Sequence, residues 1–78
     1  MVLHAPADTV SARHRWLHGT LVPIDDERCE YRTGDHDLDW LAIRVGMLGV
    51  DFEVLEPPEL AVRLRELAGR FARAAAAP

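Results

Sequence analysis

The sequence has no lysine, only one cysteine and no long run of apolar residues. All nine basic residues of the 78-residue chain are arginine. A single cysteine, Cys29, excludes an intramolecular disulfide and fits a reducing cytoplasm. No stretch approaches the roughly 20 apolar residues of a membrane-spanning helix, and the opening Met-Val-Leu-His lacks the features of a secretory signal. We therefore expect a cytoplasmic protein.

Charge is distributed unevenly along the chain. Residues 25–59 contain eleven acidic residues and three arginines, a net charge of −8, whereas residues 1–24 carry +1 and residues 60–78 carry +3. An acidic middle argues against non-specific wrapping of duplex DNA, because affinity for duplex DNA depends on a basic surface. The length allows one domain, which we place over residues 1–78.

The clearest structural pattern is a strand, a corner and a helix near the C-terminus. Apolar and acidic residues alternate over residues 50–54, which predicts a strand with one buried face. Pro57 and Pro58 end it, because proline cannot donate a ladder hydrogen bond, and Pro58 suits the first turn of a helix. A helix over residues 59–75 follows as a C-terminal addition. Its single apolar stripe consists of Leu60, Leu64, Leu67 and Phe71.

Three further strands and two further helices are predicted upstream. The strands cover residues 1–5, 20–24 and 28–33, and the first helix covers residues 7–16. The second helix starts at Asp37 as N-cap and ends before Gly49 as C-terminal cap. We expect this second helix to be the most buried and Gly46 to mark close backbone packing. That expectation rests on the residues that widen its apolar face, which are Trp40, Ile43 and Met47.

The predicted order is β-α-β-β-α-β with an added C-terminal helix. Hairpins and right-handed crossovers favour a four-stranded antiparallel sheet with two helices on one face, which is the ferredoxin-like arrangement of the α+β class. Its strand order, 4-1-3-2, leaves the strand at residues 20–24 at an edge, as Pro23 requires. The second face of the sheet is then open, or is covered by the last helix or a partner.

Two sets of residues are candidates for binding. Arg28 and Arg32 project from the same side of one strand, where they form either a phosphate-binding row or a solvated face with cross-strand ion pairs. The stripe on the last helix packs either into the domain's own core or against a second protomer or an upstream domain. Its members, Leu60, Leu64, Leu67 and Phe71, are the candidate partner interface.

Metal binding and catalysis have weaker support. His14 and His18 lie four residues apart, and Cys29 with His36 could complete a zinc shell, but the spacing matches no zinc-finger or metalloprotease motif. Of the two acidic sets, Asp25-Asp26-Glu27 and Asp35, Asp37, Asp39, the second lacks the glycine and the distal glutamate of a calcium loop, and roles in turns and caps explain both sets. Cys29 is better explained as a small core residue. We therefore expect no metal, no cofactor and no enzymatic activity.

One segment resembles a known family. Gly46-Met47-Leu48-Gly49-Val50-Asp51-Phe52-Glu53-Val54-Leu55-Glu56-Pro57-Pro58-Glu59-Leu60 is similar to the closing segment of WYL-domain bacterial transcriptional regulators, within the C-terminal extension called the WCX domain. The opening Val2-Leu3-His4-Ala5-Pro6-Ala7 is similar to the start of that extension, so the resemblance covers nearly the whole chain. The Trp-Tyr-Leu tripeptide that names the family is absent, as is a helix-turn-helix segment.

The resemblance implies a longer protein and a regulatory function. In such regulators a winged helix-turn-helix that binds DNA is followed by a WYL barrel and then by this domain. The WYL and WCX parts sense an effector, which is single-stranded DNA in some members, and contribute to contacts in a homodimer. No individual ligand-binding residue is carried over. The alternative is a free-standing ferredoxin-like module that binds a small molecule or drives oligomerisation.

Overall fold

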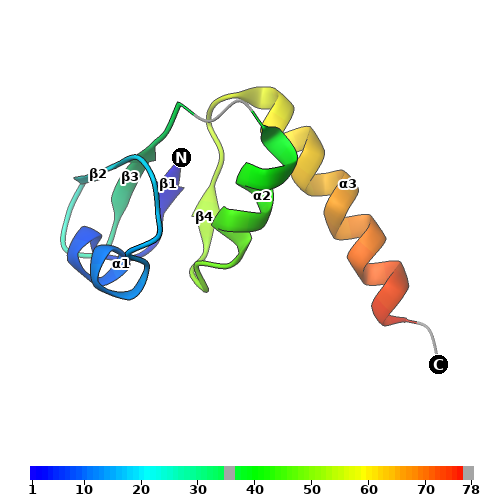
Figure 1. Ribbon diagram of the computed structural model, residues 1–78, viewed down its shortest axis with the longest axis horizontal. Coiled ribbons are helices and arrows are strands. Elements are labelled where there is room, and N and C mark those ends of the chain that lie inside the picture. Colours follow the sequence, from blue (N-terminus) through cyan, green and yellow to red (C-terminus); the bar gives the residue numbers. More distant parts are fainter. Residues whose placement is uncertain (35–36, 77–78) are drawn as a thin grey trace.

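In the part of the chain that the structure describes, the domain is a four-stranded antiparallel sheet with three helices (Figure 1). The computed structural model describes residues 1–34 and 37–76, so Asp35 and His36 lie outside the described part. The predicted order of elements is confirmed. These elements are β1 (Val2–Leu3), α1 (Ala7–Arg13), β2 (Thr20–Pro23), β3 (Cys29–Arg32), α2 (Leu38–Gly46), β4 (Phe52–Glu53) and α3 (Pro58–Ala75).

The strands follow one another across the sheet in the order β2-β3-β1-β4, which reads 4-1-3-2 from the β4 edge. β2, with Pro23, lies at the other edge, where its missing N–H costs no ladder bond. The strands are shorter than predicted, and β4 contains only Phe52–Glu53. β4 is an edge strand that pairs with β1, and β1 itself contains only Val2 and Leu3.

Both α1 and α2 pack on one face of the sheet. Val10 from α1 and Val45 from α2 belong to the same buried cluster as Leu3, Cys29 and Tyr31 from the strands. These three strand residues share a face because successive side chains of a strand point to opposite sides. The hydroxyl of the buried Tyr31 donates a hydrogen bond to the carbonyl oxygen of His18, which ties β3 to the segment between α1 and β2.

α2 begins as predicted but exposes more apolar surface than predicted. The carboxylate of Asp37 accepts a hydrogen bond from the Trp40 N–H at 3.1 Å, as an N-cap should. The expected burial of the wider face is wrong, since the exposed fractions of Trp40, Ile43 and Met47 are 55%, 41% and 66%. A Cβ on Gly46 would meet no atom within 4 Å, so the expected close packing there is also wrong. The inward stripe is already complete with Leu41, Ala42, Val45 and Leu48.

α3 lies beside α2, and its C-terminal half extends away from the sheet (Figure 1). Only Leu60, in its first turn, is buried. Leu64 and Leu67 are partly buried against the core, whereas Phe71 is 62% exposed. An exposed ion pair between Arg63 Nε and Asp39 Oδ1, at 2.8 Å, links α3 to α2 and contributes at most about 1 kcal/mol. The first turns of α3 therefore hold it on the domain.

Candidate functional site

Both candidate arginines of β3 and its turn are paired with carboxylates. Arg28 donates through Nη2 and Nε to Asp25 Oδ2 at 2.8 and 3.0 Å, across the β2–β3 turn. Arg32 donates through Nε to Glu30 Oε1 at 2.7 Å within β3. The hydrogen bond from Arg28 lowers the pKa of the Asp25 carboxyl, and that from Arg32 lowers the pKa of Glu30. Both guanidinium groups remain solvent-accessible but are electrostatically compensated.

The open sheet face around these arginines is not a basic surface. Val22, Glu30, Val2 and Glu53 follow one another across the four strands as direct register partners. They point away from the core, because their neighbours along each strand face it. His4 Nε2 lies 3.0 Å from Glu53 Oε1 on the same face. Carboxylates thus stand between and beside the cationic groups, which opposes the approach of a polyanion.

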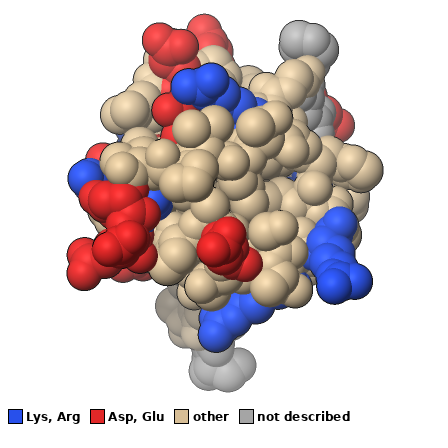
Figure 2. Space-filling view, turned by 90° about the vertical axis from the view of Figure 1, so that its left-hand side faces the viewer, with Lys and Arg blue, Asp and Glu red and all other residues tan. Residues whose placement is uncertain are grey.

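The surface seen from the β2 side supports this description (Figure 2). Acidic side chains gather along one side of this view, the arginines are scattered, and the centre is largely uncharged. Strong binding of a phosphate backbone depends on several neighbouring cations. The view offers no such group, so electrostatic attraction on this side of the molecule is weak.

A second candidate surface is an apolar groove between α2 and α3. It encloses about 440 Å³ and combines three residues of the predicted stripe with one wall from α2. Leu60, the fourth member of that stripe, lies in the domain's own core and does not line the groove. The α2 wall was missed because its residues were expected to be buried. The lining consists of Ala42, Ile43, Gly46, Met47, Leu64, Leu67, Ala68 and Phe71, which we call the α2–α3 groove.

Comparison with protein families gives a decisive match. The model described as WCX domain matches residues 2–72. The chain belongs to the WCX domain family. This family is associated with WYL-type regulators, so the match supports a regulatory domain that functions within a larger protein. Comparisons with curated proteins and with solved structures found no match.

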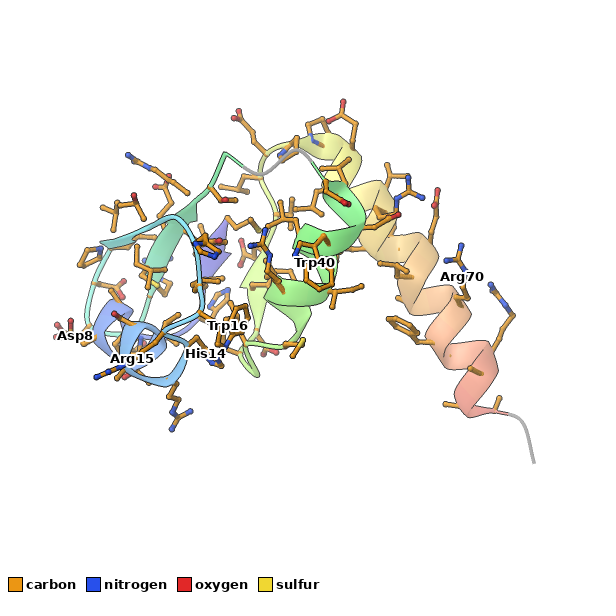
Figure 3. All side chains as sticks on the ribbon, viewed as in Figure 1. Asp8, His14, Arg15, Trp16, Trp40 and Arg70 are labelled. Atoms are coloured by element: carbon orange, nitrogen blue, oxygen red, sulfur yellow. The ribbon has the colours of Figure 1, made fainter. Side chains whose placement is uncertain are left out.

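His14 and His18 of this WCX domain take part in structural contacts. His14 Nε2 lies 3.0 Å from the carbonyl oxygen of Leu48, and its ring contacts Trp16 edge-to-face at 5.5 Å (Figure 3). His18 contributes its backbone carbonyl to Tyr31. Within residues 1–34 and 37–76, no three histidine, cysteine or acidic residues are grouped so as to hold a metal ion. His36, which belonged to the hypothetical zinc set, lies outside the described residues.

Cys29 is fully buried in the WCX core. Burial raises the pKa of its thiol, because the thiolate would lose its hydration in apolar surroundings. A neutral, inaccessible thiol is a poor nucleophile. Cys29 therefore acts as a small core residue beneath α1 and α2.

Among the helices in the described residues, none is long and apolar enough to cross a membrane.

Proposed function

We propose that this WCX domain is a non-catalytic regulatory part of a longer, cytoplasmic WYL-type transcriptional regulator of a bacterium. In that protein a winged helix-turn-helix binds DNA, a WYL barrel follows, and the WCX domain senses an effector and contributes to homodimer contacts. The family match over residues 2–72 is the observation that carries the proposal. The strand order and the helices on one face support a ferredoxin-like assignment of the fold.

The proposed effector is single-stranded DNA, with Arg28 and Arg32 as the proposed contacts. A guanidinium can bind a phosphate through two parallel hydrogen bonds, and both side chains reach solvent. Each already pairs with a carboxylate, so a phosphate must displace Asp25 or Glu30 before it binds. Displacement reduces the gain in free energy per contact. Affinity should therefore depend on additional contacts from the WYL barrel.

Removing both arginines tests this contact. In the full regulator, Arg28→Ala with Arg32→Ala should weaken the binding of a single-stranded oligonucleotide. It should also reduce the slope of log affinity against log salt by about 1.4, since each lost phosphate contact on a single strand contributes about 0.7. The matched control is Arg65→Ala with Arg70→Ala, which removes the same charge from the exposed side of α3. Equal losses in both pairs, or an unchanged slope in the first, would argue against the arginine contact.

The proposed dimer contact lies at the α2–α3 groove. The groove exposes an apolar lining from two helices, and Phe71 at its end is more than half exposed. Apolar surface concentrated in this way is typical of protein–protein contacts. Val62 lies two residues before Leu64, which lines the groove. Two residues along a helix correspond to a rotation of about 200°, so Val62 lies on the other side of α3. The two sides of α3 therefore provide a variant and its control.

Phe71→Asp should dissociate the dimer while leaving the fold intact. Burying a phenylalanine side chain contributes about 2 kcal/mol, and two-fold symmetry counts it twice, so the dissociation constant should rise about a thousandfold. Sedimentation equilibrium measures the mass, and far-UV circular dichroism checks the helices. Val62→Asp, at a position 46% exposed, should leave the mass unchanged. A wild-type domain that is monomeric at high concentration rules out this dimer contact.

A further inference from the structure

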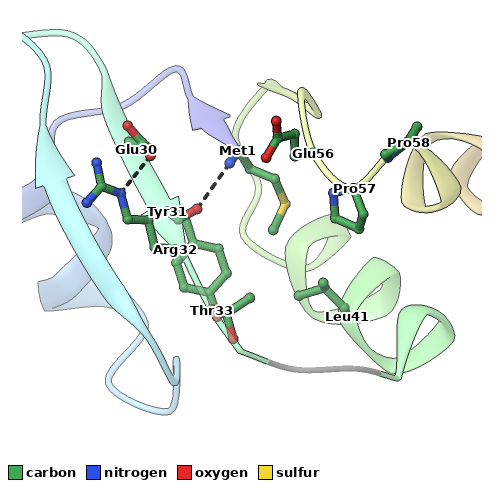
Figure 4. A pocket seen from close by; sticks show the side chains of 9 residues that line it. All are labelled: Met1, Glu30, Tyr31, Arg32, Thr33, Leu41, Glu56, Pro57 and Pro58. Carbon is green, nitrogen blue, oxygen red and sulfur yellow. Dashed lines mark hydrogen bonds and ion pairs between the residues drawn. The ribbon is translucent and has the colours of Figure 1, made fainter.

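The strand β2 forms one edge of the sheet and directs backbone groups away from it. The Met1 ammonium group donates to the carbonyl of Tyr31 at 3.1 Å, and the Tyr31 N–H donates to the carbonyl of Met1 at 2.7 Å, so the Tyr31 backbone points to β1 (Figure 4). Leu21 is the register partner of Tyr31 on β2. Partners in an antiparallel ladder that do not bond each other direct their N–H and C=O groups to opposite sides. Both groups of Leu21 therefore point off the sheet.

Pro23 continues this row of outward groups. The N–H of Ile24 donates to the carbonyl of Arg28 at 3.0 Å, so the neighbouring pair of Pro23 and Cys29 is again one without mutual hydrogen bonds. The C=O of Pro23 thus points off the sheet on the same side as that of Leu21. In the part of the chain that the structure describes, these groups make no hydrogen bond outside the ladder. Since proline has no N–H, the edge offers one donor and two acceptors.

A hollow lies alongside this edge, between β2 and α1. It measures about 710 Å³, and its apolar lining includes Ala12, Leu17 and Leu21. The Leu21 side chain points to this side, because its register partner Tyr31 is buried in the core beneath the helices. β2 itself, Thr20–Pro23, contains no charged residue. Charged side chains on an edge strand discourage the pairing of a further strand, and β2 lacks this protection.

Opposite charges stand at the two ends of the hollow. α1 runs antiparallel to β2, because β1 and β2 are both antiparallel to β3 and α1 connects the end of β1 to the start of β2. Asp8, in the first turn of α1, therefore lies towards Pro23, whereas Arg15, just after α1, lies towards Thr20 (Figure 3). Within the described residues, neither charged side chain forms an ion pair. Both are available to a ligand.

We propose that the β2 edge binds an extended segment of a partner polypeptide, which adds a further strand antiparallel to β2. Extended peptides bind exposed sheet edges in this way, with backbone hydrogen bonds for affinity and alternate side chains for specificity. The outward groups recur at every second residue, as the ladder of a strand requires, so they suit a strand better than a compact ligand. The hollow receives every second side chain of the segment.

The lining of the hollow determines the residue types of the segment. The residue opposite Leu21 exchanges two hydrogen bonds with it and points into the apolar part of the hollow, so it is apolar. Two residues earlier, the segment lies opposite Pro23 and beside Asp8, so that residue is basic. Two residues later, it lies beside Arg15, so that residue is acidic. The partner therefore carries a basic, an apolar and an acidic residue at alternate positions of an extended stretch.

The β2 edge is separate from both surfaces of the proposed function. The hollow shares no lining residue with the α2–α3 groove, and neither Arg28 nor Arg32 lines it. A partner bound at β2 therefore leaves the proposed effector and dimer contacts accessible.

Two peptides that differ only in the position of one methyl group test the proposal on the 78-residue chain. Both have the sequence acetyl-Thr-Lys-Thr-Val-Thr-Glu-Thr-amide. In the probe, the methyl group is on the amide nitrogen of the threonine after valine, which points away from β2. In the control, it is on the valine nitrogen, which donates to the carbonyl of Leu21 in the proposed complex.

In an NMR titration, the probe should shift the amide signals of Thr20, Leu21 and Val22 saturably and slow hydrogen exchange at Leu21. The control should bind at least about tenfold more weakly, because it lacks one hydrogen bond and its methyl group keeps the strands apart. Absence of saturable binding at millimolar probe, equal binding of the two peptides, or shifts that omit Leu21 overturns the proposal.

The two charged ends and the hollow itself are tested separately. The peptide acetyl-Thr-Glu-Thr-Val-Thr-Lys-Thr-amide, methylated like the probe, places like charges at Asp8 and Arg15 and should bind about three- to tenfold more weakly. Ala12→Arg, at an exposed position of α1, places a long side chain in the hollow and should weaken probe binding by a similar factor. Its matched control, Ala72→Arg on α3, adds the same charge elsewhere and should leave the affinity unchanged. Unchanged affinity for the exchanged peptide or in the Ala12→Arg variant overturns the assignment of the hollow.

Discussion

Gly19→Ala is expected to abolish the native fold under conditions in which the wild-type chain is folded. Gly19 adopts φ of +123°, a conformation that residues with a Cβ rarely adopt. An added Cβ would also overlap the carbonyl oxygen of Arg32 and lie 2.7 Å from Cε1 of Tyr31. Tyr31 is buried in the core, so it has little room to move away. Circular dichroism and thermal unfolding measure the loss.

The magnitudes determine the outcome for Gly19→Ala. Backbone strain of this kind costs about 1–3 kcal/mol, and overpacking adds about 1–3 kcal/mol. A single core in a domain of this size contributes only about 3–5 kcal/mol of stability, so the combined cost is comparable to the whole. The matched control is Gly46→Ala, where the added Cβ meets no atom within 4 Å. It should stabilise the domain by up to about 1 kcal/mol through better helix propensity. A cooperatively folded Gly19→Ala variant with wild-type stability would contradict this account.

Local patterns in the sequence were sufficient to predict the elements and their order. Alternation around Tyr31 predicted which face of β3 is buried, since Cys29 and Tyr31 both lie in the core. Asp37 was recognised as an N-cap from its residue type and position, and its carboxylate makes the capping bond. The edge position of β2 followed from Pro23. These features depend on period and residue type, which a single sequence contains.

Features that depend on how the elements meet were harder to predict. Trp40, Ile43 and Met47 are apolar and helical in spacing, but the inward face of α2 was already filled. Ile43 and Met47 line the groove instead, and Trp40 is exposed. The length of β4 was overestimated because β4 pairs with the short β1, whose register partners to it are Val2 and Leu3. The exposure of these α2 residues and the length of the strand both depend on how the elements pack together in three dimensions.

For the candidate arginines, too, the face of the strand was predictable from the sequence but the contacts with other residues were not. Their common side on β3 followed from the strand period, whereas their carboxylate partners depend on local turn geometry. Asp25 reaches Arg28 because the β2–β3 turn brings them together, and its carboxylate also accepts the Glu27 N–H at 2.9 Å. The sequence suggested cross-strand pairs. The observed partners lie in the turn and within β3 itself.

Leu60→Ala is the second substitution with a large expected effect, because one residue anchors the helix that carries the proposed dimer contact. Leu60 is fully buried and is the only buried residue of α3. Truncating a buried leucine to alanine costs about 2–5 kcal/mol, which is most of the stability available to so small a domain. The exposed ion pair from Arg63 contributes too little to hold α3 in place. We expect the unfolding midpoint to fall sharply.

The variant also distinguishes a helix that belongs to the core from one that is merely attached to it. If α3 is integral, Leu60→Ala lowers the stability of the whole domain, and hydrogen exchange accelerates in β3 as well as in α3. If α3 detaches alone, exchange accelerates only in α3.

Val62→Ala, on the exposed side of the same helix, should change stability by no more than about 0.5 kcal/mol. Leu60→Met, which keeps the volume, should lose less than about 1.5 kcal/mol. Because Leu60 packs with residues from β1, β3 and α2 in a single cluster, we expect the first result, in which the start of α3 completes the core and positions Phe71 at the groove.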